Sequence, residues 1–261
     1  MNTERVPVLM YHRVGDANNP WSKKLTVSAD NFRAQMQKLA ARGFTPCGID
    51  DFVSWLNGHR QLPGKSFLIT FDDGYAGVYE HAFPVLRDMQ WTASVFLVSG
   101  LIGNQDAWCE HENPSGESYP LMNPAQILEM SSNGFSFHSH SRSHADLGQL
   151  DTTQLENELR GSREDLESLL NKPVPYFAYP FGRYNSNVIN VTRQAGYEAA
   201  FSVQPGFNRP GTDPFIIRRI DVYGTDTPTQ LLRKTSYGMN NGSWRESLKY
   251  FYKQLRRKLN V

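Results

Sequence analysis

Two clusters of polar residues could carry chemistry in this sequence, and each follows a short apolar run. Asp72 and Asp73 stand at the end of the run Ser66–Phe71, and His140 and His144 follow a second run. A divalent metal used for hydrolysis needs a few nitrogen and oxygen ligands and an open position for water. Asp73, His140 and His144 would provide that set, so the sequence predicts a metal site.

The two adjacent carboxylates are expected to have separate tasks. On an extended backbone neighbouring side chains face opposite ways, so Asp72 would point away from a metal that Asp73 binds. A carboxylate such as Asp72 can then act as general base for a metal-bound water, whose pKa is about 7. Asp-Asp-Gly is common in turns, and an His-x-x-x-His pair alone is as often structural as metal-binding. Their joint position after apolar runs favours metal-assisted hydrolysis of an acyl group.

The elements that would position these residues alternate between strands and helices. Apolar runs bounded by turn residues predict strands at Val6–Tyr11, Ser66–Phe71, Ala93–Val98, Phe135–His138, Tyr176–Tyr179, Ala199–Val203 and Phe215–Ile220. Between these runs, the capping residues Ser28, Asn123 and Asn185 precede amphipathic segments. This alternation is typical of one α/β domain with a parallel sheet or barrel.

Composition narrows the classes of function. The 261 residues carry a net charge of +1, which argues against nucleic acid as a partner and favours a neutral substrate. No run is apolar enough to span a bilayer, and the first residues show no signal-peptide pattern, so we expect a cytoplasmic protein. Cys47 and Cys109 form no Cys-x-x-Cys pair, which fits free thiols, while a single disulfide between them stays open.

Three segments resemble, in order, the first three motifs of the polysaccharide deacetylases (carbohydrate esterase family 4, the NodB homology domain). They are Thr70–Gly74, His140–His144 and Phe177–Gly182. The resemblance implies a single-domain distorted (β/α) barrel with its active site at the carboxyl ends of the strands. It assigns residues 65–261 to the NodB homology domain and residues 1–64 to an extension that adds a strand and helices, as in biofilm-type poly-N-acetylglucosamine deacetylases.

The resemblance implies roles that agree with metal-assisted hydrolysis. The catalytic base matches Asp72, and the metal ligands match Asp73, His140 and His144. Ser141 matches a residue that braces the histidine loop. Zinc is the default ion for such a set, and iron, cobalt and nickel accept the same ligands.

The third motif implies an oxyanion and substrate segment at Tyr179, Pro180 and Phe181. The backbone N–H of Phe181 matches the group that helps to hold the oxyanion. Many members also carry an arginine in this motif that orients the catalytic base, and Ala178 stands at the matching place here. The restraint on the base must then come from elsewhere, and the sequence does not rank the candidates Arg13, Arg218 and Arg219.

The general acid is a second departure from the family pattern. Many members supply it from a late Leu-x-His motif, but no histidine follows His144. In the biofilm-type arrangement an early strand brings this histidine, so the resemblance assigns the acid to His12, at the end of Pro7–Tyr11. The alternative is that His12 only packs or hydrogen-bonds there. Asp221 could orient a catalytic group or pair with an arginine.

These observations predict a metal-dependent hydrolase that removes N-acetyl groups from an N-acetylated sugar or polysaccharide. Two alternatives stay open: hydrolysis of a non-sugar amide or cyclic ureide, and a glycan-binding module with little catalysis. The polar segment Gly103–Tyr119 is expected to form a loop that shapes one wall of a cleft.

Residues 243–261 predict a C-terminal helix. Ser243 and Glu246 form a capping box, and the residues that follow divide into an apolar and a basic face. Such a helix could rest on an anionic membrane surface, at the inner face of the membrane. The alternative is a helix that closes the barrel and exposes its basic face to solvent.

Overall fold

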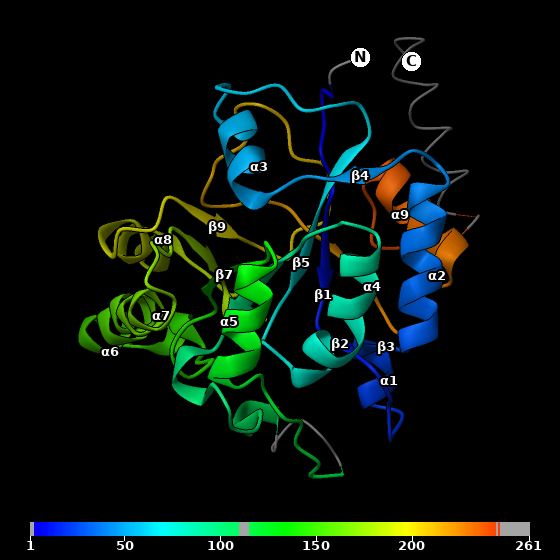
Figure 1. The fold of residues 1–261 in the computed structure, drawn as a ribbon. Coiled ribbons are helices and arrows are strands. Elements are labelled where there is room, and N and C mark those ends of the chain that lie inside the picture. The colour runs from blue at the N-terminus through cyan, green and yellow to red at the C-terminus, as the bar shows by residue number, and fades with distance from the viewer. Residues whose placement is uncertain (1–2, 110–114, 244, 246–261) are drawn as a thin grey trace.

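The computed structural model describes residues 3–109, 115–243 and 245. An eight-stranded parallel sheet runs through the molecule (Figure 1). Seven strands follow the order β10-β1-β5-β6-β7-β8-β9, and β4 pairs with β5 off this path. The strands are β1 Val8–Tyr11, β4 Thr45–Pro46, β5 Ser66–Phe71, β6 Ser94–Leu97, β7 Ser136–Ser139, β8 Tyr176–Ala178, β9 Ala199–Phe201 and β10 Ile220–Asp221. A second, two-stranded sheet joins β2 Arg13–Val14 to β3 Thr26–Val27.

The sheet is curled, with helices around its outside (Figure 1). A bridge between Phe201 in β9 and Ile217, just before β10, joins the two ends of the strand order. The α-helices are α1 Ser22–Leu25, α2 Ala29–Ala40, α3 Ile49–Leu56, α4 Phe83–Asp88, α5 Pro124–Ser132, α6 Thr152–Glu156, α7 Ser162–Leu170, α8 Ser186–Gln194 and α9 Pro228–Tyr237. Single π-helical turns, η1 Val78–Ala82 and η5 Asn157–Gly161, precede α4 and join α6 to α7. The short 3₁₀ turns are η2 Ser99–Leu101, η3 Ala107–Cys109, η4 Leu147–Gln149 and η6 Pro180–Gly182.

The helix starts follow the sequence. Ser28, Asn123 and Asn185 each accept a hydrogen bond from a backbone amide in the first turn of α2, α5 and α8, as their capping pattern predicts. The strand predicted at Phe215–Ile220 is wrong in extent, because regular pairing is confined to β10. The Arg218 amide donates to the Asn208 side chain at 2.9 Å, so that side chain replaces a ladder partner.

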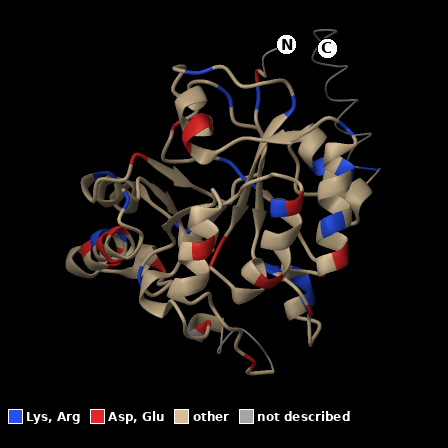
Figure 2. Ribbon diagram, in the orientation of Figure 1, with Lys and Arg blue, Asp and Glu red and all other residues tan. Residues whose placement is uncertain are grey.

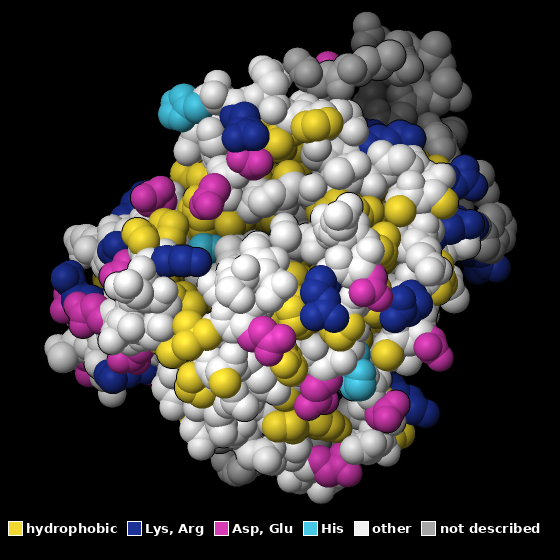
Figure 3. Space-filling model, viewed as in Figure 1, with side chains coloured by type: hydrophobic (Ala, Val, Ile, Leu, Met, Phe, Trp, Pro, Cys, Tyr) yellow, Lys and Arg dark blue, Asp and Glu magenta, His cyan; other side chains and the backbone are white. Residues whose placement is uncertain are grey.

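Burial separates the sheet from its surroundings. Every residue of β1 and β5 is buried, and the two main apolar clusters lie on opposite sides of these strands. Figure 2 shows most charged residues on helices and loops, and Figure 3 shows acidic and basic side chains interspersed on this face. Buried polar groups at the strand ends are therefore exceptional in this fold, and they mark a candidate functional site.

Residues before position 65 and residues after it share one sheet, because β1 pairs with both β5 and β10. The boundary between positions 64 and 65 stays a prediction. The capping residue Glu246 and the rest of the predicted C-terminal helix, apart from Ser243 and Arg245, lie outside the described residues. Within the described part of the chain, no helix has the length and apolar character to cross a membrane.

Candidate metal and catalytic site

Side chains from four strand ends meet in one cleft of about 110 Å³. The cleft lies at the carboxyl ends of β1, β5, β7 and β8, where the chain leaves each strand. Its lining includes the candidates predicted for metal binding and catalysis, namely His12, Asp72, Asp73, His140, His144, Tyr179 and Phe181. The parallel sheet therefore gathers residues that are far apart in sequence.

Three of these side chains are arranged as a metal-binding set. Oδ1 of Asp73 lies 3.3 Å from Nε2 of His140 and 3.3 Å from Nε2 of His144. All three side chains are buried, and their candidate ligand atoms lie within 4.8 Å of one another. Asp73 Oδ1 accepts no hydrogen bond from the described residues. A buried carboxylate oxygen that faces two imidazole nitrogens fits a divalent cation.

The tautomer of His140 supports the same conclusion. Its Nδ1 lies 2.8 Å from the carbonyl oxygen of Ala178. Because a carbonyl can only accept, Nδ1 must carry the hydrogen, which leaves the Nε2 lone pair free toward Asp73. Ala178 thus serves the site through its backbone, at the position where the family pattern has an arginine.

The two histidines come from a tight loop and not from a helical turn. Ser141 and His144 both have left-handed backbones, with φ of 65° and 62°. Ser141 Oγ accepts the His144 amide at 3.0 Å, so this residue ties the two ends of the loop together. The bond agrees with the bracing role that the resemblance implies.

The orientation expected for the two carboxylates is wrong. Asp73 follows β5 with φ of 73°, so the alternation of an extended strand has already ended there. As a result Asp72 and Asp73 line the same cleft and do not point to opposite sides of the sheet. Two carboxylates in one cleft need separate counter-charges.

Arg219 provides that counter-charge for Asp72. Its guanidinium donates from Nη1 to Oδ1 at 2.6 Å and from Nη2 to Oδ2 at 2.8 Å. The Arg219 side chain is fully buried, and its Nε donates to the Ser202 carbonyl at 2.9 Å. Burial alone would raise the pKa of Asp72, but the charge and hydrogen bonds of Arg219 outweigh it and lower that pKa. Asp72 is therefore an oriented carboxylate at neutral pH.

His12 reaches the cleft through strand register. Tyr11 at the end of β1 pairs with Phe71 at the end of β5, so His12 and Asp72 leave the sheet side by side. Nδ1 of His12 is buried without a hydrogen-bond partner among the described residues. Met10 pairs with Asp221 on the other side of β1.

Asp221 is held by polar neighbours. Its carboxylate accepts hydrogen bonds from the Tyr223 hydroxyl at 3.2 Å and from the Asn240 side chain. Burial raises the pKa of Asp221. The described residues contain no ion pair between Asp221 and an arginine, and its predicted orienting role stays a prediction.

The third motif forms a turn beside His144. Phe181 and Gly182 have φ of 56° and 65°, and a Cβ at Gly182 would lie 2.2 Å from Val203, so only glycine fits there. The Phe181 ring contacts the His144 ring at 4.5 Å between centroids. The Tyr179 side chain is buried and donates its hydroxyl to the Phe215 carbonyl at 3.1 Å.

The loop expected to form a cleft wall contributes Trp108. Its indole ring stacks on the His144 ring at 4.4 Å and 20°. Cys109 lines the cleft, and both Cys109 and Cys47 are free thiols. Residues 110–114 of this loop lie outside the described residues.

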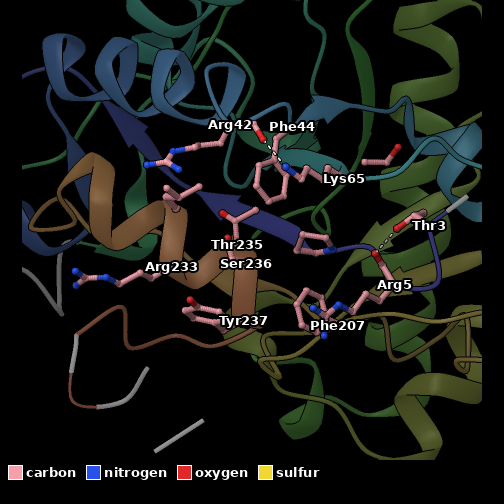
Figure 4. Close-up of a pocket in the computed structure, with 13 residues that line it drawn as sticks. Thr3, Arg5, Arg42, Phe44, Lys65, Phe207, Arg233, Thr235, Ser236 and Tyr237 are labelled. Carbon is pink, nitrogen blue, oxygen red and sulfur yellow. Dashed lines mark hydrogen bonds between the residues drawn. The ribbon is translucent and has the colours of Figure 1, made fainter. Parts of the chain in front are cut away.

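A larger pocket, of about 460 Å³, lies at the amino ends of β1 and β5 (Figure 4). It contains the basic residues Arg5, Arg42, Lys65 and Arg233. Figure 4 shows that Arg42 and Arg233 extend away from Lys65, whose ammonium donates to the Arg42 carbonyl at 2.8 Å. These cations do not converge on one point, so the pocket offers no comparable site.

Comparison with known proteins agrees with this geometry. Residues 59–200 match the family model of polysaccharide deacetylases. YxkH of Bacillus subtilis, which is named as a member of that family, is 27% identical over 218 residues, covering 84% of this chain and 71% of that protein. A poly-β-1,6-N-acetyl-D-glucosamine N-deacetylase of Staphylococcus aureus is 24% identical over 235 residues, covering 81% of this chain and 77% of that protein.

Two solved structures share the fold. A polysaccharide deacetylase from Bacillus cereus is 30% identical with a TM-score of 0.73, covering 88% of this chain and 68% of that chain. IcaB from Ammonifex degensii is 26% identical with a TM-score of 0.73, covering 90% and 97%. The predicted (β/α) barrel of the NodB type is confirmed.

Proposed function

This chain belongs to the polysaccharide deacetylase family, and we propose that it is a metal-dependent enzyme that removes acetyl groups from an N-acetylated polysaccharide. The resemblance carried by three short motifs is thereby confirmed, as is the enzyme class, hydrolases of carbon–nitrogen bonds. The observation that carries the proposal is the meeting of three groups in one cleft: the Asp73-His140-His144 set, Asp72 held by Arg219, and His12.

The residues divide the reaction between them. A divalent ion held by Asp73, His140 and His144 would supply a Lewis acid that polarises the acetyl carbonyl and activates water. Asp72 takes the proton from the attacking water, and its lowered pKa keeps it ready to do so. The Phe181 amide donates to the oxyanion. His12 protonates the departing nitrogen, so that acetate and a free amine leave.

A named relative suggests the substrate for the first test, and the ligand set suggests the ion. The name of the Staphylococcus aureus relative supports β-1,6-linked N-acetylglucosamine oligomers as substrate. The His₂Asp ligand set supports zinc as the ion. The missing third-motif arginine was one reason to keep a binding-only module open. That reason is weaker because Arg219, just before β10, binds the carboxylate of Asp72 instead.

The test uses the full chain, stripped of metal with a chelator and reloaded with zinc, cobalt, nickel or iron. We expect acetate and free amine in equal amounts from the oligomers, and a kcat about 10²–10⁴-fold lower for His12→Gln at unchanged metal content. Unchanged kcat in that variant would remove His12 from the mechanism. Ring opening of a cyclic ureide without acetate release would contradict the substrate class, and oligomer binding without turnover by any loaded form would favour the binding module.

A further inference from the structure

Arg13 is a buried cation that the proposed mechanism does not use. It is the first residue of β2, directly after His12, and is 4% exposed. Its guanidinium carbon lies 3.8 Å from the Tyr119 ring centroid, 5.3 Å from that of Tyr75 and 5.7 Å from that of Trp21. Its Nη2 donates a long hydrogen bond to the Ser22 carbonyl, but Nε and Nη1 have no partner among the described residues. Aromatic contacts offset part of the burial of this charge and leave its N–H groups unsatisfied.

A second unsatisfied group lies next to it. Arg13 and Thr26 are register partners in the β2–β3 pair, and Thr26 Oγ1 is also buried without a partner within the described chain. Both residues line a pocket of about 130 Å³. That volume holds roughly four waters at about 30 Å³ each, or one or two polar groups of a sugar. Buried polar atoms that lack partners beside a polar pocket indicate a missing polar ligand.

The rim of this pocket adds acceptors. Asp16 and Glu80 are exposed carboxylates there, and Nε2 of His81, which also lines the pocket, lies 3.9 Å from Oε2 of Glu80. Gly15, with φ of 139°, leaves no Cβ in the way of the His81 ring, because an added Cβ would lie 2.9 Å from it. The pocket thus has the guanidinium of Arg13 and the hydroxyl of Thr26 in its wall and carboxylate acceptors at its rim. This combination suits a sugar, whose hydroxyl groups both donate and accept.

Tyr75 connects this pocket to the catalytic cleft, because its ring lines both. Trp21, one of the rings around Arg13, also lines the cleft. We propose that the pocket formed by Arg13, Thr26, Asp16, Glu80 and His81 is a binding subsite for a hydroxyl-bearing sugar unit next to the unit that loses its acetyl group. The subsite rests on the proposed function, since it requires a polymeric glycan in the cleft.

The test compares substrates that do and do not reach the subsite. Thr26→Val removes one hydroxyl at nearly constant volume, and Glu80→Gln removes one exposed charge. For a pentamer of β-1,6-linked N-acetylglucosamine, each variant should raise KM about 5- to 10-fold at unchanged kcat. Turnover of the single sugar should not change. Glu156→Gln, an exposed carboxylate on α6, is the matched control and should behave like the unaltered protein.

Direct binding separates failure of the subsite from failure of the proposed function. Calorimetric titration of the pentamer into the Asp72→Asn protein measures affinity without turnover, and adding Thr26→Val or Glu80→Gln should weaken that affinity by the same factor. Weakened binding supports the subsite even if no acetate is ever released. Equal affinity in all variants, or no affinity for the pentamer, overturns it and leaves ordered water as the partner of Arg13.

Discussion

The carboxylate of Asp72 depends on a residue 147 positions away in the sequence. Arg219 binds both of its oxygens, and neither side chain reaches solvent to any extent. A paired, bidentate arrangement fixes the direction of the carboxylate as well as its charge. The other two candidates have different partners. Arg13 contacts aromatic rings, and Arg218 donates a hydrogen bond to the Pro205 carbonyl. Orientation of the proposed base is thus assigned to one side chain, Arg219.

Replacing Arg219 should change the pH dependence of the reaction. Arg219 lowers the pKa of Asp72 against the effect of burial, so its loss lets burial raise that pKa. Because the base works only when deprotonated, the acid limb of kcat/KM should move to higher pH in Arg219→Met. It should move less in Arg219→Lys, which keeps the charge and loses the fork.

The measurement is the kcat/KM profile of the metal-loaded variants, with the melting temperature recorded alongside. Breaking a buried ion pair costs about 3–5 kcal/mol of stability, so Arg219→Met could unfold. Arg219→Lys keeps the positive charge and allows the measurement in that case. Arg218→Lys, which alters a neighbouring exposed arginine, should keep the original acid limb. An acid limb that stays in place in both Arg219 variants would show that Arg219 does not set the pKa of the base.

At the scale of elements, the histidine loop is held by the segments on either side of it. In η2, the amides of Ser99 and Gly100 donate to the carbonyls of Ser141 and Arg142 at 3.1 and 2.8 Å. Opposite them, Glu158 in the π-turn η5 accepts the amides of Arg142 and Ser143, both at 2.9 Å. Left-handed residues such as Ser141 cost free energy and persist only where the surroundings fix them.

Glu158 should therefore control metal affinity without touching the metal. It also accepts the Ser143 hydroxyl at 2.6 Å, so Glu158→Ala removes three hydrogen bonds from the loop. We expect about 10- to 100-fold weaker metal binding in that variant, measured by calorimetry. Glu158→Gln should bind nearly as well as the original, because its amide can replace each bond. Glu164→Ala, on the exposed side of α7, is the control, and equal affinity in Glu158→Ala would contradict the role.

The elements that the sequence predicts well are those with local signals. The apolar run Ser66–Phe71 is β5 with the same bounds. Asn123 caps α5, as its position before an amphipathic segment predicts. The helix α9 escaped prediction although Thr227 and Gln230 form a capping box that could have revealed it. The π-turn η5 has no local signal in the sequence, and its residue Glu158 meets the histidine loop only through tertiary packing.

For the site, the sequence supplies the residues and the fold supplies the geometry. The motif spacing predicted Asp73, His140 and His144 as one metal set, and the structure brings them together. The link between Asp72 and Arg219 could not be derived, because it depends on where β10 joins the sheet. The left-handed backbone of Asp73 could not be derived either, since the pattern before it is that of a strand.

At the scale of the whole molecule, stability in acid depends on a histidine away from the cleft. His138 in β7 is buried between the rings of Phe96 and Tyr176, at 5.9 and 4.8 Å, and neither imidazole nitrogen has a partner within the described chain. Burial lowers the pKa of His138 to about 3. In the unfolded chain a histidine has a pKa of about 6.5, so the unfolded state binds a proton that the folded state excludes.

The free energy of unfolding should therefore fall as the pH decreases from about 6.5 toward about 3, and the part due to His138 amounts to about 2 kcal/mol at pH 5. His138→Phe fits the same aromatic surroundings without a titrating group. Denaturant unfolding at pH 7 and pH 5, in chelator so that metal binding does not contribute, should show a smaller loss in this variant by about that amount. His59→Gln, an exposed histidine, should keep the full loss. Equal losses in His138→Phe and the unaltered protein would mean that His138 takes up its proton in the folded state, and that the core around Phe96 opens to water in acid.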